Sequence, residues 1–290
     1  MQNQKRATLF ALIAVTFWST VATAFKLTLR SVEPAQMLLV AAPVSAAVLA
    51  LALMTRGVSW QRVFAPHYLL RSALVGLLNP FLYYLILFQA YDRLPGQVAQ
   101  PLNFTWAIAL TLLSVLMLGQ KIRAASWIGI LVSFFGVLIL ATGGHLRSMD
   151  FGDPLGVGLA LSTSLLWALY WILNMKDPRR PLEKLFLGFF FGSIYITVFA
   201  LISGVSFRLP LSGLAGGLYV GLFEMGLTFL LWLSALEMSE NTARISNLIF
   251  LAPFLSLILL SLVAGEQILA SSIVGLFFIV GGIGIQKRWG

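Results

Sequence analysis

Two stretches of this chain, VAQPLNFTWAIALTLLSVLMLGQ at residues 98–120 and TARISNLIFLAPFLSLILLSLVAGE at residues 242–266, are versions of one pattern. Both open on a residue followed by alanine, carry a matching asparagine (Asn103 and Asn247) and an internal proline, and close on glycine followed by Gln or Glu. Each is apolar and long enough to cross a bilayer. The chain is therefore expected to contain a duplicated membrane-spanning unit.

The pattern extends on both sides of these stretches, so that each copy covers about half of the chain. An apolar stretch around Trp18 matches one around Trp167, and glycines one heptad apart follow each quoted stretch. We therefore expect two copies, at residues 1–146 and 150–290, with five spans each. Because five is odd, the second copy must be inverted relative to the first, as in transporters whose halves surround a central cavity.

Ten runs of predominantly apolar residues are candidates for helices that cross the hydrocarbon core, which takes about 20 residues. They lie near residues 7–28, 34–54, 69–90, 96–118, 125–142, 154–174, 184–204, 212–236, 241–263 and 269–286. The predicted fold is an all-α integral membrane protein with ten transmembrane helices, in two inverted five-helix repeats around a central cavity.

The composition argues against soluble and catalytic classes. Hydrophobic residues make up 59% of the 290 residues and charged residues 10%, too few polar side chains for the surface of a soluble protein. The chain has no cysteine, two histidines and no GxxxxGK[ST] phosphate loop. We therefore expect no enzyme activity, no metal and no cofactor.

The net charge of +9 comes from basic residues that separate the apolar runs, and no nucleic-acid motif accompanies them. With the N-terminus in the cytoplasm, most of the 19 Lys and Arg residues fall on the cytoplasmic side, as the positive-inside rule requires. We expect a multi-pass protein of a bacterial inner membrane with both termini cytoplasmic, a monomer or weak dimer whose partners are lipid and a small molecule and no nucleic acid.

Several aromatic residues lie at bilayer depth, away from the interfaces where Trp and Tyr usually collect. Trp18, Trp106 and Trp167 are near the middles of their spans, and Tyr83 and Tyr170 are somewhat off centre. Such rings could simply pack helices or contact lipid. As a set they favour a partly aromatic cavity, which offers stacking and cation-π contact to a ligand.

Polar residues at the same depth are costly against lipid and should face the bundle interior. The main candidates are Ser19, Asn79, Asn103, Ser164 and Asn247. Each could bond a neighbouring helix or a substrate, and the sequence leaves both interpretations open.

Glu224 is the one carboxylate close to the centre of a span. A carboxylate there must be protonated, paired or in contact with water. It could bind a substrate ammonium or a coupling proton, or it could belong to a buried salt bridge. Lys26 and Arg244 are the candidate charge partners.

Prolines interrupt four spans internally, at Pro43, Pro80, Pro101 and Pro253. Each removes a backbone N–H and leaves the carbonyl four residues earlier without its helical partner. A kink at Pro80, Pro101 or Pro253 could let a helix end move as a gate, whereas Pro43 is better explained as a static bend.

This set of features resembles the EamA branch of the drug/metabolite transporter superfamily over essentially the whole chain. The resemblance rests on the two five-span copies, Trp18-Ser19 in the first span with Lys26 at its end, prolines in spans four and nine, and Gly265-Glu266 closing span nine. The chain differs from the usual pattern in having Gln120 where Glu is common and Ser19 where glycine is frequent.

Within the family the chain is most similar to YddG-type exporters of aromatic amino acids, which also handle methyl viologen. The resemblance implies a ten-helix basket that opens alternately to each side, with the substrate stacked on Trp18, Trp106, Trp167 or Tyr83. The alternative is a nucleotide-sugar or other metabolite carrier of the same superfamily, which would need deep basic residues for phosphate.

Overall fold

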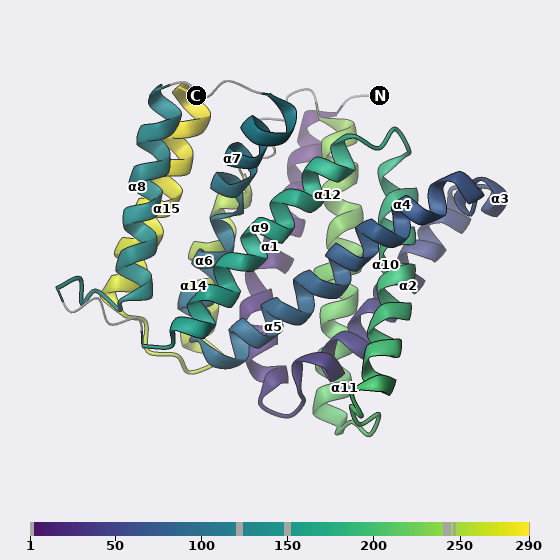
Figure 1. The fold of residues 1–290 in the computed structure, drawn as a ribbon, viewed down its shortest axis with the longest axis horizontal. Helices are drawn as coiled ribbons and strands as arrows, with labels where there is room; N and C mark the ends of the chain where they lie inside the picture. Colours follow the sequence, from purple (N-terminus) through teal and green to yellow (C-terminus); the bar gives the residue numbers. More distant parts are fainter. Residues whose placement is uncertain (1–2, 120–123, 148–151, 240–244, 246–247, 290) are drawn as a thin grey trace. The chain divides into compact units, whose positions relative to one another are not determined.

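The computed structural model describes residues 3–119, 124–147, 152–239, 245 and 248–289. All the regular elements assigned in these residues are helices (Figure 1), as an all-α protein requires. Within them, seven segments are long and apolar enough to span a membrane: Gln4–Leu29, Pro34–Thr55, Pro66–Arg93, Gly96–Met117, Pro154–Met175, Pro181–Ile202 and Leu211–Met238. Shorter apolar helices cover Trp127–Ala141, Leu251–Leu262 and Ala270–Ile285. The membrane class is thus supported, while ten spans and the inverted repeat stay predictions.

The first compact unit consists of Met1–Leu85 and Asp177–Leu259. Its elements are α1 (Gln4–Leu29), α2 (Pro34–Thr55), the short α3 (Trp60–Val63), α4 (Pro66–Gly76), η1 (Leu77–Leu82), α10 (Pro181–Ile202), α11 (Leu211–Tyr219), η2 (Val220–Gly226), α12 (Leu227–Met238) and η3 (Leu248–Phe250). Within this unit α10 packs along α2 and α4, and α1 packs along α12.

The second unit consists of Ile86–Lys176 and Leu260–Gly290. Its helices are α6 (Gly96–Phe104), α7 (Trp106–Leu118), α8 (Ala124–Ala141), α9 (Pro154–Met175) and α15 (Ala270–Trp289), while α5 (Tyr83–Arg93) and α14 (Leu251–Leu262) begin in the first unit and end in the second. Within this unit α9 packs against α6 and α7.

Each unit therefore combines segments from both predicted sequence copies. The division into residues 1–146 and 150–290 describes a sequence pattern, whereas the compact units follow helix packing, and the two need not coincide. The predicted copies stay a prediction.

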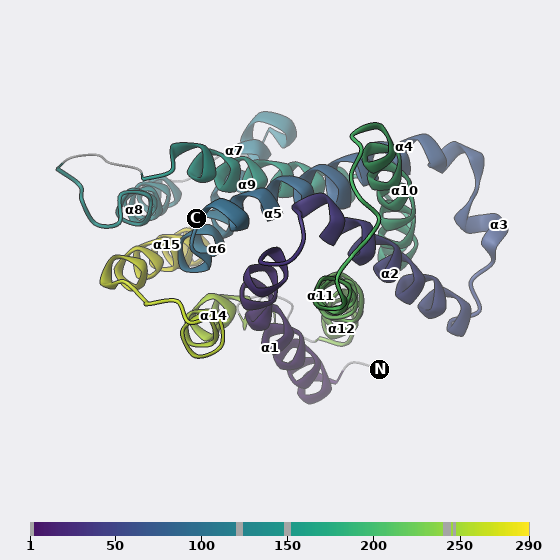
Figure 2. The same cartoon turned by 90° about the horizontal axis from the view of Figure 1, so that it is seen from below.

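Glycines set the closest helix contact of the second unit, between α8 and α15, which run side by side in both views (Figures 1 and 2). A Cβ on Gly136 would lie 2.6 Å from the Gly275 carbonyl oxygen, and one on Gly282 would lie 2.4 Å from that of Gly129. The Ser133 hydroxyl donates to the Ile279 carbonyl across this contact, at 3.0 Å. The heptad glycines thus allow two backbones to approach closely.

Two of the long segments of the first unit are interrupted in their middles. Asn79 has extended backbone angles inside η1 and precedes Pro80 through a cis peptide bond. Gly226 leaves helical geometry at the end of η2, directly after Glu224 and Met225. By contrast, Pro43 lies within α2, whose helix is continuous from Pro34 to Thr55. In this unit the interruptions place polar side chains at mid-span, where backbone groups also lose their helical partners.

Candidate functional site

Trp18 lies in the middle of α1 and packs edge-on against two rings of α12. Its ring centroid is 5.9 Å from that of Phe229 and 5.2 Å from that of Trp232. The preceding residue, Phe17, lies 5.0 Å from Phe223 of η2. Trp18 is only partly buried by these neighbours, so part of its ring surface is not covered by the protein.

Glu224 of η2 is bonded to the phenol of Tyr84, the second residue of α5. The Tyr84 hydroxyl donates to Oε1 of Glu224 at 3.1 Å, and the Tyr84 side chain is fully buried. Oε2 of Glu224 is buried too and has no hydrogen-bond partner. A buried carboxylate with one neutral donor retains acceptor capacity for a donor that arrives with a substrate, or for a proton. The partners predicted for Glu224 were basic residues, because they were chosen by charge. Tyrosine is neutral, so Tyr84 was not predicted as its partner.

Asn79 and Tyr83 lie close in sequence to this pair. Asn79 is 1% exposed, and neither atom of its side-chain amide has a hydrogen-bond partner. Tyr83 packs edge-on against Tyr84, with centroids 4.8 Å apart. Asn79 and the Tyr84–Glu224 pair are thus buried with incomplete hydrogen bonding within the protein. Buried polar groups normally have a partner, and here a water or a bound molecule could supply it.

The predicted serines are less available. The Ser19 hydroxyl donates to the Thr16 carbonyl at 2.6 Å, and the Ser164 hydroxyl donates to the Leu161 carbonyl at 2.7 Å. Both hydroxyl protons are thus used within their own helices, although the oxygens can still accept.

Four predicted residues are left to place: Lys26, Arg244, Asn247 and Pro253. Lys26 is partly buried in the last turn of α1. Asn247 and Arg244 lie outside the described residues, so the proposed match of Asn247 with Asn103 stays a prediction. Pro253 falls in the first turn of α14, where a missing N–H costs little.

In the second unit, Trp167 and Tyr170 of α9 stack on each other, with centroids 5.4 Å apart and an interplanar angle of 25°. Trp171 meets Trp167 edge-on at 6.0 Å, and its indole N–H is buried without a partner. Trp106 begins α7 and is half-buried. The unit thus presents a partly exposed indole face beside an unsatisfied donor.

Helix α6 carries Asn103 and Pro101. The Asn103 amide donates to the Thr163 hydroxyl of α9 at 2.9 Å, so Asn103 serves at least one interhelical bond. The N-terminus of α6 is bonded by Glu266, whose Oε1 accepts from the Gly96 amide at 2.7 Å and whose Oε2 accepts from the Gln97 amide at 3.2 Å. The sequence identified Glu266 as part of the Gly265-Glu266 motif at the end of span nine. The residues that it contacts are known only from the structure.

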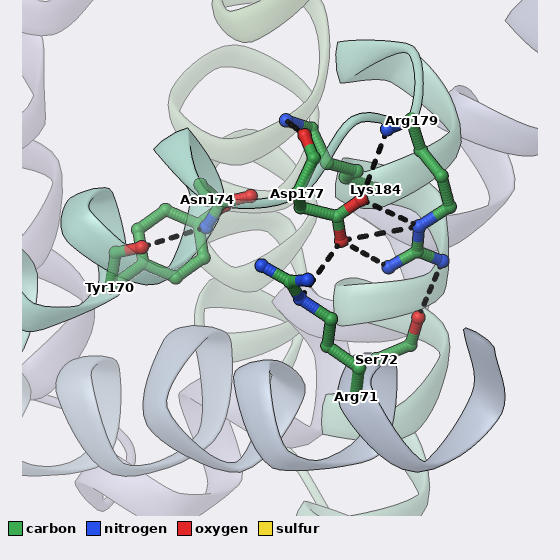
Figure 3. A network of polar contacts seen from close by, with 7 residues as sticks. All are labelled: Arg71, Ser72, Tyr170, Asn174, Asp177, Arg179 and Lys184. Carbon is green, nitrogen blue, oxygen red and sulfur yellow. Dashed lines mark hydrogen bonds and ion pairs between the residues drawn. The ribbon is translucent and has the colours of Figure 1, made fainter. Parts of the chain in front are cut away.

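A charged network immediately precedes α10 in the first unit (Figure 3). Arg179 donates to both oxygens of Asp177, with a closest contact of 2.6 Å, and to the Ser72 hydroxyl at 2.8 Å. Arg71 lies 3.4 Å from Asp177. Burial alone would raise the pKa of Asp177, but the hydrogen bonds and positive charge of Arg179 outweigh it and hold that pKa below its ordinary value. These basic residues thus brace the connection before α10.

A metal site is not indicated, since no group of three or more His, Asp or Glu side chains with suitable geometry occurs among the described residues.

Comparisons with known proteins agree with a transport role. The model of the EamA-like transporter family matches residues 5–142 and 154–285. An uncharacterized transporter of Clostridium kluyveri is 27% identical over 57% of this chain, and the match spans only about half, 54%, of that protein. The aromatic amino acid exporter YddG of Ancylobacter novellus is 25% identical over 91% of this chain and 90% of its own length. A solved crystal structure shares the fold with a TM-score of 0.69 over 99% of this chain and 100% of that chain, at 22% identity.

Proposed function

The chain belongs to the EamA-like transporter family, and on that premise we propose that it is a secondary transporter of aromatic and other neutral amino acids. Its direction would be export across the bacterial inner membrane, by alternating access between two inverted repeats. Flat cationic drugs such as methyl viologen would share the site through cation-π contact. The two ranges that match the family, and the similarity to an aromatic amino acid exporter, support this proposal.

The observation that carries the proposal is the presence of partly exposed rings together with unsatisfied buried polar atoms, the latter in the interrupted segments. In the first unit these are Trp18, Asn79 and the Glu224 carboxylate. An aromatic amino acid needs an apolar surface for its ring and hydrogen-bonding groups for its ammonium and carboxylate. The described residues offer both kinds of group at span depth.

The roles we assign follow from these contacts. The substrate ring would stack on Trp18 or Tyr83 of the first unit, or on Trp106 or Trp167 of the second, and Tyr170 supports Trp167 by stacking on it. Glu224 would bind the substrate ammonium through Oε2, or carry a coupling proton in its place. Pro80 and Pro101 would let the helix halves on either side of them move separately during transport.

The experiment is uptake of radiolabelled Phe, Trp, Thr and a nucleotide sugar by liposomes that contain the purified full chain, with and without a pH gradient. Faster entry of Phe and Trp than into empty liposomes is the expected result. A dependence on the gradient would show proton coupling, and its loss in Glu224→Gln would assign the coupling proton to Glu224. Entry of the nucleotide sugar alone would overturn the proposal in favour of a metabolite carrier.

A further inference from the structure

Helix α6 has a polar face that is bonded at both ends and unsatisfied in the middle. Gln97, Gln100 and Asn103 are spaced three residues apart and so lie on one side of the helix. The helix has nine residues and contains Pro101. A helix this short is marginal without support, and the proline removes one of its hydrogen bonds. Its geometry therefore depends on contacts from outside.

The N-terminal support comes from the connection between α14 and α15. The two Glu266 oxygens accept from the Gly96 and Gln97 amides, which are among the first N–H groups of α6 and have no partner inside it. In return, the Gln97 side chain donates to the Gln267 carbonyl at 2.8 Å and accepts from the Leu269 amide at 2.9 Å. We call these four bonds the Glu266 clamp. A carboxylate at this position also interacts favourably with the helix dipole.

Gly96 is the residue that lets the clamp close. A Cβ at this position would lie 2.7 Å from Leu260 and 3.3 Å from Oε1 of Glu266. Any larger side chain would therefore press on the carboxylate and on the apolar residue beside it. The glycine thus has a steric role here, since it allows the acid to approach the backbone.

At the other end, Asn103 bonds Thr163 of α9 at 2.9 Å. Between the two supports lies Gln100, whose side chain is 6% exposed and whose carbonyl Oε1 is buried with no partner. Buried amide oxygens nearly always accept a hydrogen bond. Because both neighbours on this face already have partners in the protein, the open acceptor is the position where a ligand donor would fit.

We propose that the Gln100 side-chain carbonyl binds an N–H group of the transported substrate, and that Glu266 is the positioning residue that holds α6 in the register this contact requires. The inference rests on the proposed function for the identity of the substrate. Two N–H groups of an aromatic amino acid have the required chemistry, the ammonium and the indole N–H of tryptophan. The clamp itself involves no substrate and can be tested separately.

The binding half is tested by Gln100→Met, which keeps the length of the side chain and removes the acceptor. We expect the KM for uptake to rise about tenfold with little change in Vmax, the effect of one lost buried hydrogen bond. Gln100→Glu keeps acceptor oxygens at this position, and because an acid buried here should be protonated, its KM should stay within about threefold of wild type. An equal rise for Phe and Trp assigns the contact to the ammonium, and a rise for Trp alone assigns it to the indole. A wild-type KM for both substrates in Gln100→Met overturns the proposal.

The positioning half is tested by Glu266→Gln and Gly96→Ala. A glutamine has one acceptor oxygen and so can serve only one of the two amides. Both variants should speed hydrogen exchange of the amides of residues 96 and 97 by about tenfold and raise the KM by about fivefold, with Vmax preserved. The matched control is Gln267→Ala, because the clamp uses only the backbone of Gln267 and its side chain is exposed.

The two halves fail in distinguishable ways. If wild-type protein transports no amino acid, the proposed function has failed, while faster exchange in Glu266→Gln would still establish the clamp. If exchange at residues 96 and 97 is unchanged in both variants, the clamp is wrong even where transport is normal. A fall in Vmax at constant KM would show that Glu266 supports folding or movement and does not position Gln100.

Discussion

Glu224 in the first unit and Glu266 in the second are the same side chain in opposite situations. Glu266 uses both oxygens, each accepting a backbone amide of α6. Glu224 is 9% exposed and has one neutral donor, the Tyr84 phenol, with Oε2 unsatisfied. Glu266 therefore uses its hydrogen-bonding capacity to stabilise the fold, whereas Glu224 keeps one oxygen that could accept a hydrogen bond from a ligand. Asp177 belongs with Glu266, because Arg179 bonds both of its oxygens.

The largest expected effect is that of Glu224→Gln on transport. We expect the uptake rate to fall about a hundredfold, since a charged hydrogen bond to the substrate is lost. The temperature of unfolding should not fall, because glutamine keeps the acceptor for Tyr84 and removes a buried acid. The measurement is liposome uptake beside thermal unfolding in detergent, over a pH series. Normal transport with lowered stability would show that Glu224, like Glu266, stabilises the fold, and the contrast between the two acids would be wrong.

Asp177→Asn should act on stability instead. Removing one partner of a largely buried ion pair leaves the Arg179 guanidinium without its counter-charge, and we expect a loss of about 2 kcal/mol in the free energy of unfolding. Wild-type protein should lose the same contribution as the pH falls through the lowered pKa of Asp177, since folding favours the ionised carboxylate. Unfolding curves between neutral and acidic pH test both, and Asp177→Asn should flatten the acidic limb. An unchanged limb would show that another group controls it.

Tyr84→Phe tests the same comparison by removing the donor to Glu224. The substitution removes the hydrogen bond from the Tyr84 hydroxyl to Glu224 and preserves the buried ring. We expect the KM for uptake to change about fivefold, which corresponds to the free energy of one neutral hydrogen bond. Whether the KM rises or falls shows how the Tyr84 hydroxyl affects substrate binding by Glu224. A lower KM would mean that the phenol competes with the substrate for the carboxylate, and a higher KM would mean that it orients the carboxylate.

The smallest expected effects are those of Ser19→Ala and Ser164→Ala. Their hydroxyls donate to carbonyls of their own helices, so substrate contact would rely on the remaining acceptor capacity alone. We expect less than about a twofold change in KM for each. A tenfold rise in either variant would show that intrahelical bonding does not mark a polar residue as structural in this protein.

The helices of the structure lie close to the apolar runs predicted from the sequence, because helix positions depend on local hydropathy and length. The predicted runs near residues 34–54 and 154–174 correspond to α2 and α9 within one or two residues. Agreement is weaker where a span is interrupted: the run at 96–118 is divided into α6 and α7 at Thr105. Pro101 signalled a disturbance in this span, but the break follows at Thr105, which caps α6.

The residues of the candidate site were harder to predict from the sequence than the helix positions. Asn79, Asn103 and Glu224 were selected because polar groups are costly at bilayer depth, and all three occur in helices with interruptions or prolines. Tyr84 and Gln100 were not among the site residues predicted from the sequence. Their importance depends on which polar atoms have partners, and hydropathy carries no information about that.

By itself the sequence determined the membrane class, the EamA-like family, most span positions and the presence of polar and aromatic residues at mid-span, since these follow from composition and short-range pattern. Only the tertiary structure decided which acid is satisfied and which is not. The partner of Glu224 is 140 residues away in the chain, and one partner of Glu266 is 170 residues away. Such pairs form through helix packing, where a hydrogen bond depends on positions within a few tenths of an ångström that no local pattern specifies.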